Sequence, residues 1–191
     1  MIVMSTHYLH TTDSGILRSK EIDTRWWYLL AFRTHVLFGL MAITVGPVQF
    51  IRRLRLRYLR LHRAIGYLYG TSIGLSGMAG LIVAPFAIGG VISSAGFSLL
   101  AIVWLVATSI SILVARKGDL PTHRRWSYFS YALTFAAITQ RTLLLVPLLT
   151  DVPFLPIYQL SAWLPWLLNL GIAQMLYRSS GQPMQSTPKL G

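Results

Sequence analysis

Two histidines stand in matching surroundings, each near the start of a long apolar stretch and each followed by arginine. His62 precedes Arg63, and His123 precedes Arg124 and Arg125. Imidazoles from two different helices can clamp a b-type haem, and arginine pairs with carboxylates such as haem propionates. The sequence therefore predicts His62 and His123 as ligands of a haem iron. The alternative is that both are interfacial side chains near lipid headgroups.

A third histidine, His35, and one arginine, Arg141, lie inside apolar stretches, where ionisable side chains are costly and therefore candidate functional residues. If both stretches are helices, the two residues lie at similar depth in one half of the bilayer. We predict that His35 and Arg141 also bind the cofactor, with Arg141 facing a haem propionate or a quinone carbonyl. The alternative partners of Arg141 are helix-end carbonyls, Gln140 and Asn169.

The sequence contains none of the motifs that mark hydrolytic enzymes. It has no serine nucleophile elbow, no His-Glu-x-x-His zinc motif, no paired catalytic carboxylates and no P-loop. It also has no cysteine, which excludes thiolate metal sites and covalently attached c-type haem. If the protein is catalytic, these observations favour a membrane redox protein.

The elements that must position these residues are about five apolar stretches, each long enough to cross a bilayer core of roughly 30 Å. Because a chain in lipid must satisfy its own backbone hydrogen bonds, each stretch is predicted to be a helix. The predicted fold is an all-α, polytopic transmembrane helical bundle over 26–178, between a polar N-terminal tail (1–25) and a disordered C-terminal tail (179–191). The expected spans are 27–50, 65–88, 95–115, 126–149 and 158–177.

The composition supports a membrane protein and gives its expected orientation. Of 191 residues, 54% are hydrophobic and 12% charged, with 17 Lys and Arg against 5 Asp and Glu, which is too few charges for a soluble surface. The basic residues gather in the connections after the first and third spans, whereas the other two connections have none. The first group is Arg52, Arg53, Arg55, Arg57, Arg60 and Arg63, and the second is Arg116, Lys117, Arg124 and Arg125.

By the positive-inside rule both basic connections are cytoplasmic, so the sequence predicts an inner (plasma) membrane protein with its N-terminus outside and its C-terminus in the cytoplasm. The expected partners are the lipid bilayer and anionic lipid headgroups at the arginine-rich connections, with no nucleic acid. No partner protein is indicated.

Small and polar residues recur at helical spacing in three of the spans. Such stripes are typical of close helix packing, and they also leave room for a flat cofactor. They are His35, Gly39, Ala42, Gly46 and Gln49 in the first span; Gly66, Gly70, Gly74, Gly77 and Gly80 in the second; and His123, Ser127, Ser130, Thr134, Ala137 and Arg141 in the fourth.

Several of these residues form blocks that, together with Trp104, Trp163, Trp166 and Asn169, cover most of the chain from about 30 to 175. The blocks are His35-x3-Gly39 with Gly46-Pro47-Val48-Gln49-Phe50, Leu61-His62-Arg63-x2-Gly66-x2-Tyr69, and His123-Arg124-Arg125-Trp126 with Ser130-Tyr131-Ala132-Leu133-Thr134. In combination they resemble a family of multi-pass bacterial membrane proteins known as domain of unknown function 2306. The resemblance implies a multi-pass helical membrane protein and supplies no established activity.

The leading functional hypothesis is a haem-b-binding or quinone-linked membrane electron carrier, because the bundle offers histidines at matched depth, glycine grooves and a buried arginine. A second hypothesis is a transporter or lipid-handling protein, in which the polar face from Ser127 to Arg141 lines a path. A third is a non-enzymatic membrane subunit, whose polar face joins helices or a partner protein.

Overall fold

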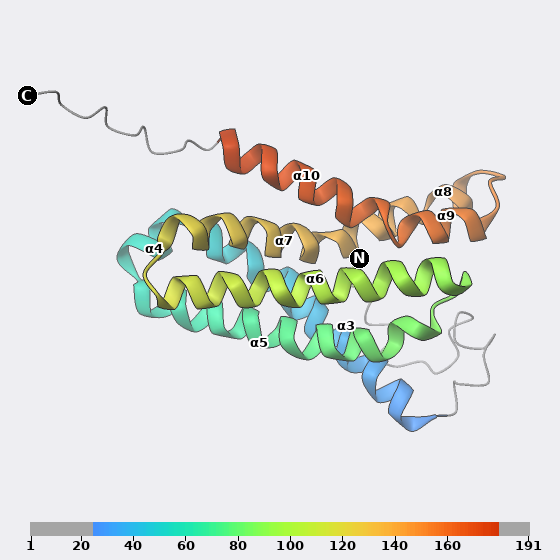
Figure 1. Cartoon of the computed structure of the whole chain (residues 1–191), viewed down its shortest axis with the longest axis horizontal. Helices are drawn as coiled ribbons and strands as arrows, with labels where there is room; N and C mark the ends of the chain where they lie inside the picture. Colours follow the sequence, from blue (N-terminus) through green and yellow to red (C-terminus); the bar gives the residue numbers. More distant parts are fainter. Residues whose placement is uncertain (1–24, 180–191) are drawn as a thin grey trace, which may run out of the picture.

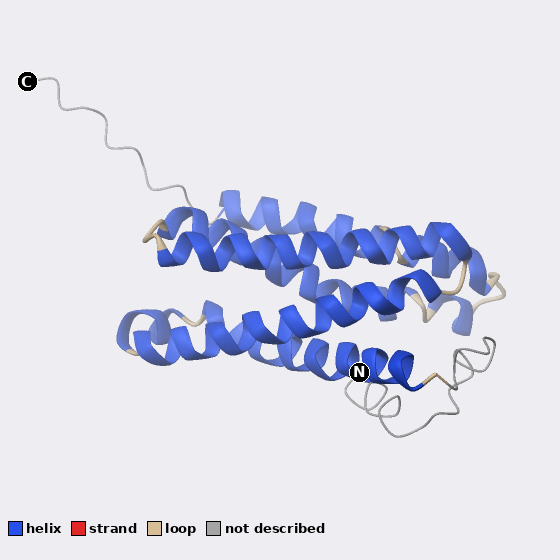
Figure 2. Cartoon of the chain, turned by 60° about the horizontal axis from the view of Figure 1, so that its bottom comes forward, coloured by secondary structure: helices blue, strands red, loops and turns tan. Residues whose placement is uncertain are grey.

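The structure, a computed structural model, describes residues 25–179, and this part of the chain is built of helices joined by short connections, with no strand (Figures 1 and 2). The expected tails lie outside the described residues, except at their inner edges. The elements are α3 (Trp26–Val45), the 3₁₀ turn η2 (Gly46–Phe50), α4 (Arg52–Arg57), α5 (Leu59–Val83), the 3₁₀ turn η3 (Ala84–Phe86), α6 (Gly90–Arg116), α7 (Leu120–Leu143), α8 (Val146–Leu149), α9 (Phe154–Ser161) and α10 (Leu164–Ser179).

Four helical segments within residues 25–179 are long and apolar enough to cross a membrane, which confirms the predicted all-α fold class. They are Trp26–Phe50, Leu59–Phe86, Gly90–Arg116 and Leu120–Leu149. Many of their large apolar side chains are exposed on the outside of the bundle, as a lipid-facing surface requires.

The fifth expected span is present as two shorter helices, α9 and α10, that meet at Ala162 and Trp163. Pro165 explains the interruption, because proline has no N–H to continue the helical hydrogen bonds and its ring clashes with the preceding turn. At this interruption the indole N–H of Trp163 donates to the carbonyl of Ile92 in α6, 3.0 Å away. The interruption lets α9 pack against α6 while α10 packs against α7.

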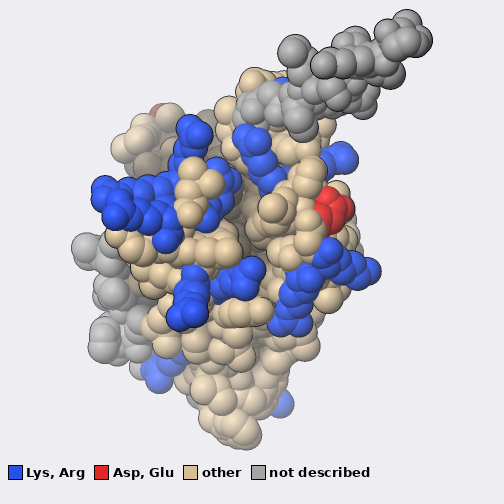
Figure 3. Space-filling view, turned by 90° about the vertical axis from the view of Figure 1, so that its left-hand side faces the viewer, with Lys and Arg blue, Asp and Glu red and all other residues tan. Residues whose placement is uncertain are grey.

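The basic residues expected in connections belong largely to helices. Arg52–Arg57 forms α4, Arg60 and Arg63 lie in α5, and Arg124 and Arg125 lie in α7. The reason is length: the 25 residues of α5 span about 38 Å, so the helix continues beyond a roughly 30 Å hydrocarbon core. These residues gather on the face of the molecule where α4 lies, here called the basic end (Figure 3).

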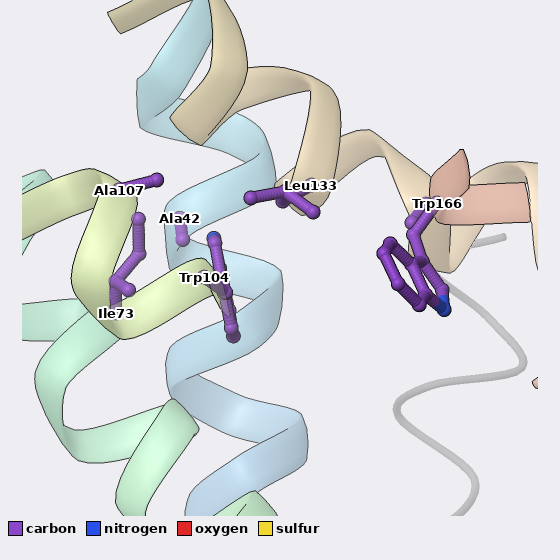
Figure 4. Packing of buried hydrophobic residues seen from close by; sticks show 7 residues of the cluster. Ala42, Ile73, Trp104, Ala107, Leu133 and Trp166 are labelled. Atoms are coloured by element: carbon purple, nitrogen blue, oxygen red, sulfur yellow. The ribbon is translucent and has the colours of Figure 1, made fainter. Parts of the chain in front are cut away.

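Helices α5 and α7 lie diagonally across the bundle from each other. Helix α5 packs against α3 and α6, whereas α7 packs against α6, α10 and α3. The core at mid-height is built around Trp104 of α6, with Ala42, Ile73 and Leu133 from the other three helices beside it (Figure 4). Two diagonal helices can therefore present side chains to a common interior space.

The glycines of α5 face two different neighbours and do not form one stripe with one partner. A Cβ on Gly80 would lie 2.9 Å from Nδ1 of His35 in α3, whereas a Cβ on Gly77 would lie 2.7 Å from Leu105 in α6. Missing side chains thus allow close approach of α3 on one side and α6 on the other. The packing interpretation of the glycines is confirmed for these contacts.

Candidate functional site

A cavity of about 670 Å³ opens at the basic end, between α5 on one side and α6 and α7 on the other. Its size falls within the usual range for small-molecule sites. Both predicted haem ligands, His62 and His123, line this cavity from the two diagonal helices.

The imidazole of His123 is held in one orientation by α6. Its Nδ1 lies 2.9 Å from the main-chain carbonyl oxygen of Ser111. A carbonyl can only accept, so Nδ1 carries the proton and Nε2 of the neutral ring carries the lone pair. The hydroxyl of Ser127 donates to the His123 carbonyl at 2.8 Å and lies 2.9 Å from the Ser111 hydroxyl. These contacts fix the orientation of the His123 ring.

The opposite wall differs, because two of its polar atoms are buried without a hydrogen-bond partner. They are Nδ1 of His62 and Nε2 of Gln49, and both residues line the cavity. A buried donor or acceptor without a partner costs about 1–3 kcal/mol. This wall therefore has unused hydrogen-bonding capacity at both residues.

Four arginines line the cavity, and no acidic residue is among the described residues that do so. They are Arg55, Arg63, Arg116 and Arg124. The guanidinium of Arg116 lies 5.5 Å from the ring centroid of Tyr67, a cation–π contact that joins α6 to α5 at the rim. The cavity therefore combines a cationic rim with a neutral interior, an arrangement suited to an amphipathic anion.

The inner end of the cavity is closed by a hydrogen-bonded cluster, which we call the hydroxyl cluster: Tyr69, Trp104, Thr108, Ser130 and Thr134. The Tyr69 hydroxyl lies 2.9 Å from Thr134 Oγ1 and 3.1 Å from Ser130 Oγ, and the Trp104 indole N–H donates to Thr134 at 2.9 Å. Ser130 and Thr108 lie 2.7 Å apart. The polar face of α7 is thus used here to bond α5, α6 and α7 together.

His35 and Arg141 are not among the residues that line this cavity. The His35 Nδ1 donates to the Ser76 carbonyl at 2.9 Å, and the Ser76 hydroxyl donates back to the His35 carbonyl at 2.8 Å. This reciprocal pair joins α3 to α5. Arg141 donates to the carbonyl of Ala137, one turn earlier in α7, at 3.0 Å. Neither His35 nor Arg141 therefore joins His62 and His123 at the cavity.

The expected amide partner of Arg141, Asn169, has other contacts. Its amide donates to the Ala132 carbonyl and pairs with the Thr139 hydroxyl, each at 3.2 Å. Among the alternative partners of Arg141, the structure shows a bond to a helix carbonyl, and this carbonyl belongs to the same helix as Arg141.

Sequence reasoning did not select three groups that the structure places at the cavity. Gln49 was assigned only to a helix face, Tyr69 only to a motif, and Ser111 was not singled out. A signal was available for Ser111, because Thr108 and Ser111 stand three residues apart in an otherwise apolar span. Nothing in the sequence separates the four cavity-lining arginines from their neighbours.

Residues 32–177 match the family model described as a predicted membrane protein, DUF2306. The match covers most of the chain and confirms the family resemblance and the multi-pass membrane character. No curated protein and no solved structure matches the chain.

Proposed function

The chain belongs to the DUF2306 family of predicted membrane proteins, and we propose that it is a membrane haem protein whose cavity at the basic end holds b-type haem between His62 and His123. One observation carries the proposal: two imidazoles reach a common cavity from helices that lie diagonally across the bundle. A planar macrocycle with two axial ligands needs such opposed side chains.

The tautomer of His123 supports an axial role. Histidines that bind metals generally donate their second ring N–H to a carbonyl or carboxylate, which orients the ring and raises its basicity. His123 makes this bond to the Ser111 carbonyl, leaving Nε2 for the iron. Since the sequence has no cysteine, the haem would be held without thioether bonds.

The charged rim supports the same assignment. Haem carries two propionates, and the guanidinium groups of Arg55, Arg63, Arg116 and Arg124 offer charge-assisted hydrogen bonds to carboxylates at the mouth of the cavity. Gly46 and Gly66 also line the cavity, and the Tyr131 ring and the Gln49 amide pack against them. The propionates would therefore face the basic end.

By the positive-inside rule the basic end is cytoplasmic, which places the proposed haem in the cytoplasmic half of the inner membrane. A haem at that depth, with no hydrolytic motif nearby, suits one-electron transfer, including transfer linked to a membrane quinone. The arginines outside the cavity, such as Arg53 and Arg60, would then contact anionic headgroups.

A second candidate is a lipid-handling or transport function for the same cavity. It is favoured by the exposed apolar side chains at the rim, since Leu56 is 73% and Leu120 is 64% exposed while both line the cavity. An anionic amphiphile could place its charged group among the arginines and its chain against these leucines. His62 and His123 have no necessary role in that case.

Titration of detergent-purified protein with haemin separates the two candidates. The haem proposal predicts saturation at one haem per chain, with a Soret spectrum of a six-coordinate bis-imidazole complex. His62→Ala and His123→Ala should each abolish the six-coordinate spectrum, and added imidazole should restore it in part by occupying the vacated position. Unaltered binding and spectrum in both variants would favour the amphiphile site.

A further inference from the structure

Gln49 is the unexplained polar residue of the cavity. It lies within the 3₁₀ turn η2, at the end of the first span, and it lines the cavity with its amide Nε2 buried and unpartnered. On the same wall, Nδ1 of His62 is also buried without a hydrogen-bond partner. Two such atoms on one wall call for a common explanation.

The Gln49 amide fills the space that a side chain on Gly66 would occupy. Its oxygen lies 3.4 Å, and its nitrogen 4.0 Å, from the position of a Cβ on Gly66. His62 precedes Gly66 by four residues, and side chains four residues apart are neighbours on the surface of a helix. The Gln49 amide therefore stands one turn along α5 from His62, on the same face of the helix.

Resting on the proposed haem function, we propose that Gln49 is the positioning residue of His62. With Nε2 of His62 on the iron, Nδ1 carries a proton and requires an acceptor. The two groups are not hydrogen-bonded in this structure, and a rotation of the Gln49 side chain toward His62 would bring its carbonyl oxygen to Nδ1 as that acceptor. His62 is then held by Gln49 as His123 is held by the Ser111 carbonyl.

The nature of the acceptor has a redox consequence. A neutral amide carbonyl leaves the His62 imidazole neutral, whereas a carboxylate in the same place would draw its proton and strengthen electron donation to the iron. Oxidised haem, which carries the greater charge, is stabilised by that donation. Gln49→Glu should therefore lower the haem midpoint potential, while Gln49→Leu removes the acceptor altogether.

The test compares Gln49→Leu, Gln49→Glu and a control, Gln140→Leu, which alters a glutamine of α7 that does not line the cavity. Haemin affinity and midpoint potential are measured for each. We expect Gln49→Leu to bind haemin about 10- to 100-fold more weakly, the range typical of second-layer partners of metal ligands. Gln49→Glu should retain binding with a more negative potential, and Gln140→Leu should match the parent protein in both.

The outcomes separate this inference from the function on which it rests. If the parent protein takes up no haemin, the haem function has failed. If the parent binds haemin but Gln49→Leu retains its affinity, or Gln49→Glu retains its potential, the haem function stands and the role of Gln49 is overturned. Because Glu and Gln have the same shape, Gln49→Glu gives a decision even where Gln49→Leu does not fold.

Discussion

Removal of the Tyr69 hydroxyl should cost only one hydrogen bond, although that oxygen has two partners. Thr134 already gives its proton to the Ser130 carbonyl at 2.9 Å, so Tyr69 must be the donor in its 2.9 Å contact with Thr134. Thr108 likewise gives its proton to the Trp104 carbonyl. The single Ser130 proton then goes to Thr108, the shorter contact at 2.7 Å, which leaves no proton for the 3.1 Å contact between Tyr69 and Ser130.

This proton count sets the size of the effect. Hydrogen bonds between membrane helices contribute about 0.6 kcal/mol on average and about 1.7 kcal/mol at most. Tyr69→Phe leaves a lone pair of Thr134 unused but no donor unpaired, so we expect a loss of about 1 kcal/mol. The Tyr67→Phe change on the same helix keeps the ring that Arg116 contacts and should alter stability by less than about 0.5 kcal/mol.

Reversible unfolding in mixed micelles, followed by circular dichroism during an SDS titration, measures these values. Two double-mutant cycles isolate the bonds. The cycle of Tyr69→Phe with Thr134→Val should give a coupling near 1 kcal/mol, within the membrane range. The cycle with Ser130→Ala should give less than about 0.5 kcal/mol. Equal couplings, or a larger one to Ser130, would refute the proton assignment.

Two further predictions concern the basic end. Arg63→Gln should weaken haemin binding about tenfold, because it removes one charge-assisted contact. The control, Arg60→Gln, alters an arginine one turn away that does not line the cavity, and it should leave the affinity unchanged. Equal affinities of the two variants would contradict the proposed propionate contact. Hydrogen bonds from the Thr122 side chain and backbone N–H lower the pKa of Asp119, the N-cap of α7. Its ionised form therefore stabilises the protein above the ordinary carboxyl pKa, and this contribution is lost as the pH falls through the lower, folded-state pKa. In Asp119→Asn the side chain can still cap α7, but it no longer carries a titrating carboxyl group. The thermal midpoints of the parent and the variant should therefore converge at acidic pH. A difference in midpoint that stays constant with pH would refute this role.

The fold was largely predictable because apolar length and backbone hydrogen bonding leave few choices in lipid. What the sequence did not give was the break in the last span. Pro165 marks the position, but a proline can be accommodated by a kink, and the observed interruption depends on where α9 can pack against α6. The glycines of α5 were recognised as a packing surface, but their division between α3 and α6 depends on helix rotation, which spacing alone does not determine.

The candidate site was predictable in part, because the depth of a residue in the bilayer follows from its position in a span. His62 and His123 could be paired because both stand at the same end of their spans, and depth follows from sequence position. Gln49 could not be assigned, since its importance lies in an atom left unpaired after packing. The spacing of Thr108 and Ser111 marked Ser111 as a polar residue in its span, but its bond to His123 depends on how α6 packs against α7. Depth also matched His35 with Arg141, but the bond between His35 and Ser76 is a property of the interface between α3 and α5.

The central claim is that His62 and His123 hold haem, and the most direct measurement is a reduced-minus-oxidised absorption spectrum of protein purified in detergent after expression with ample haem supply. The account predicts a Soret band with sharp α and β bands in the parent protein and loss of the six-coordinate spectrum in His123→Ala. A parent protein with no Soret band, when folded and monodisperse, would contradict it.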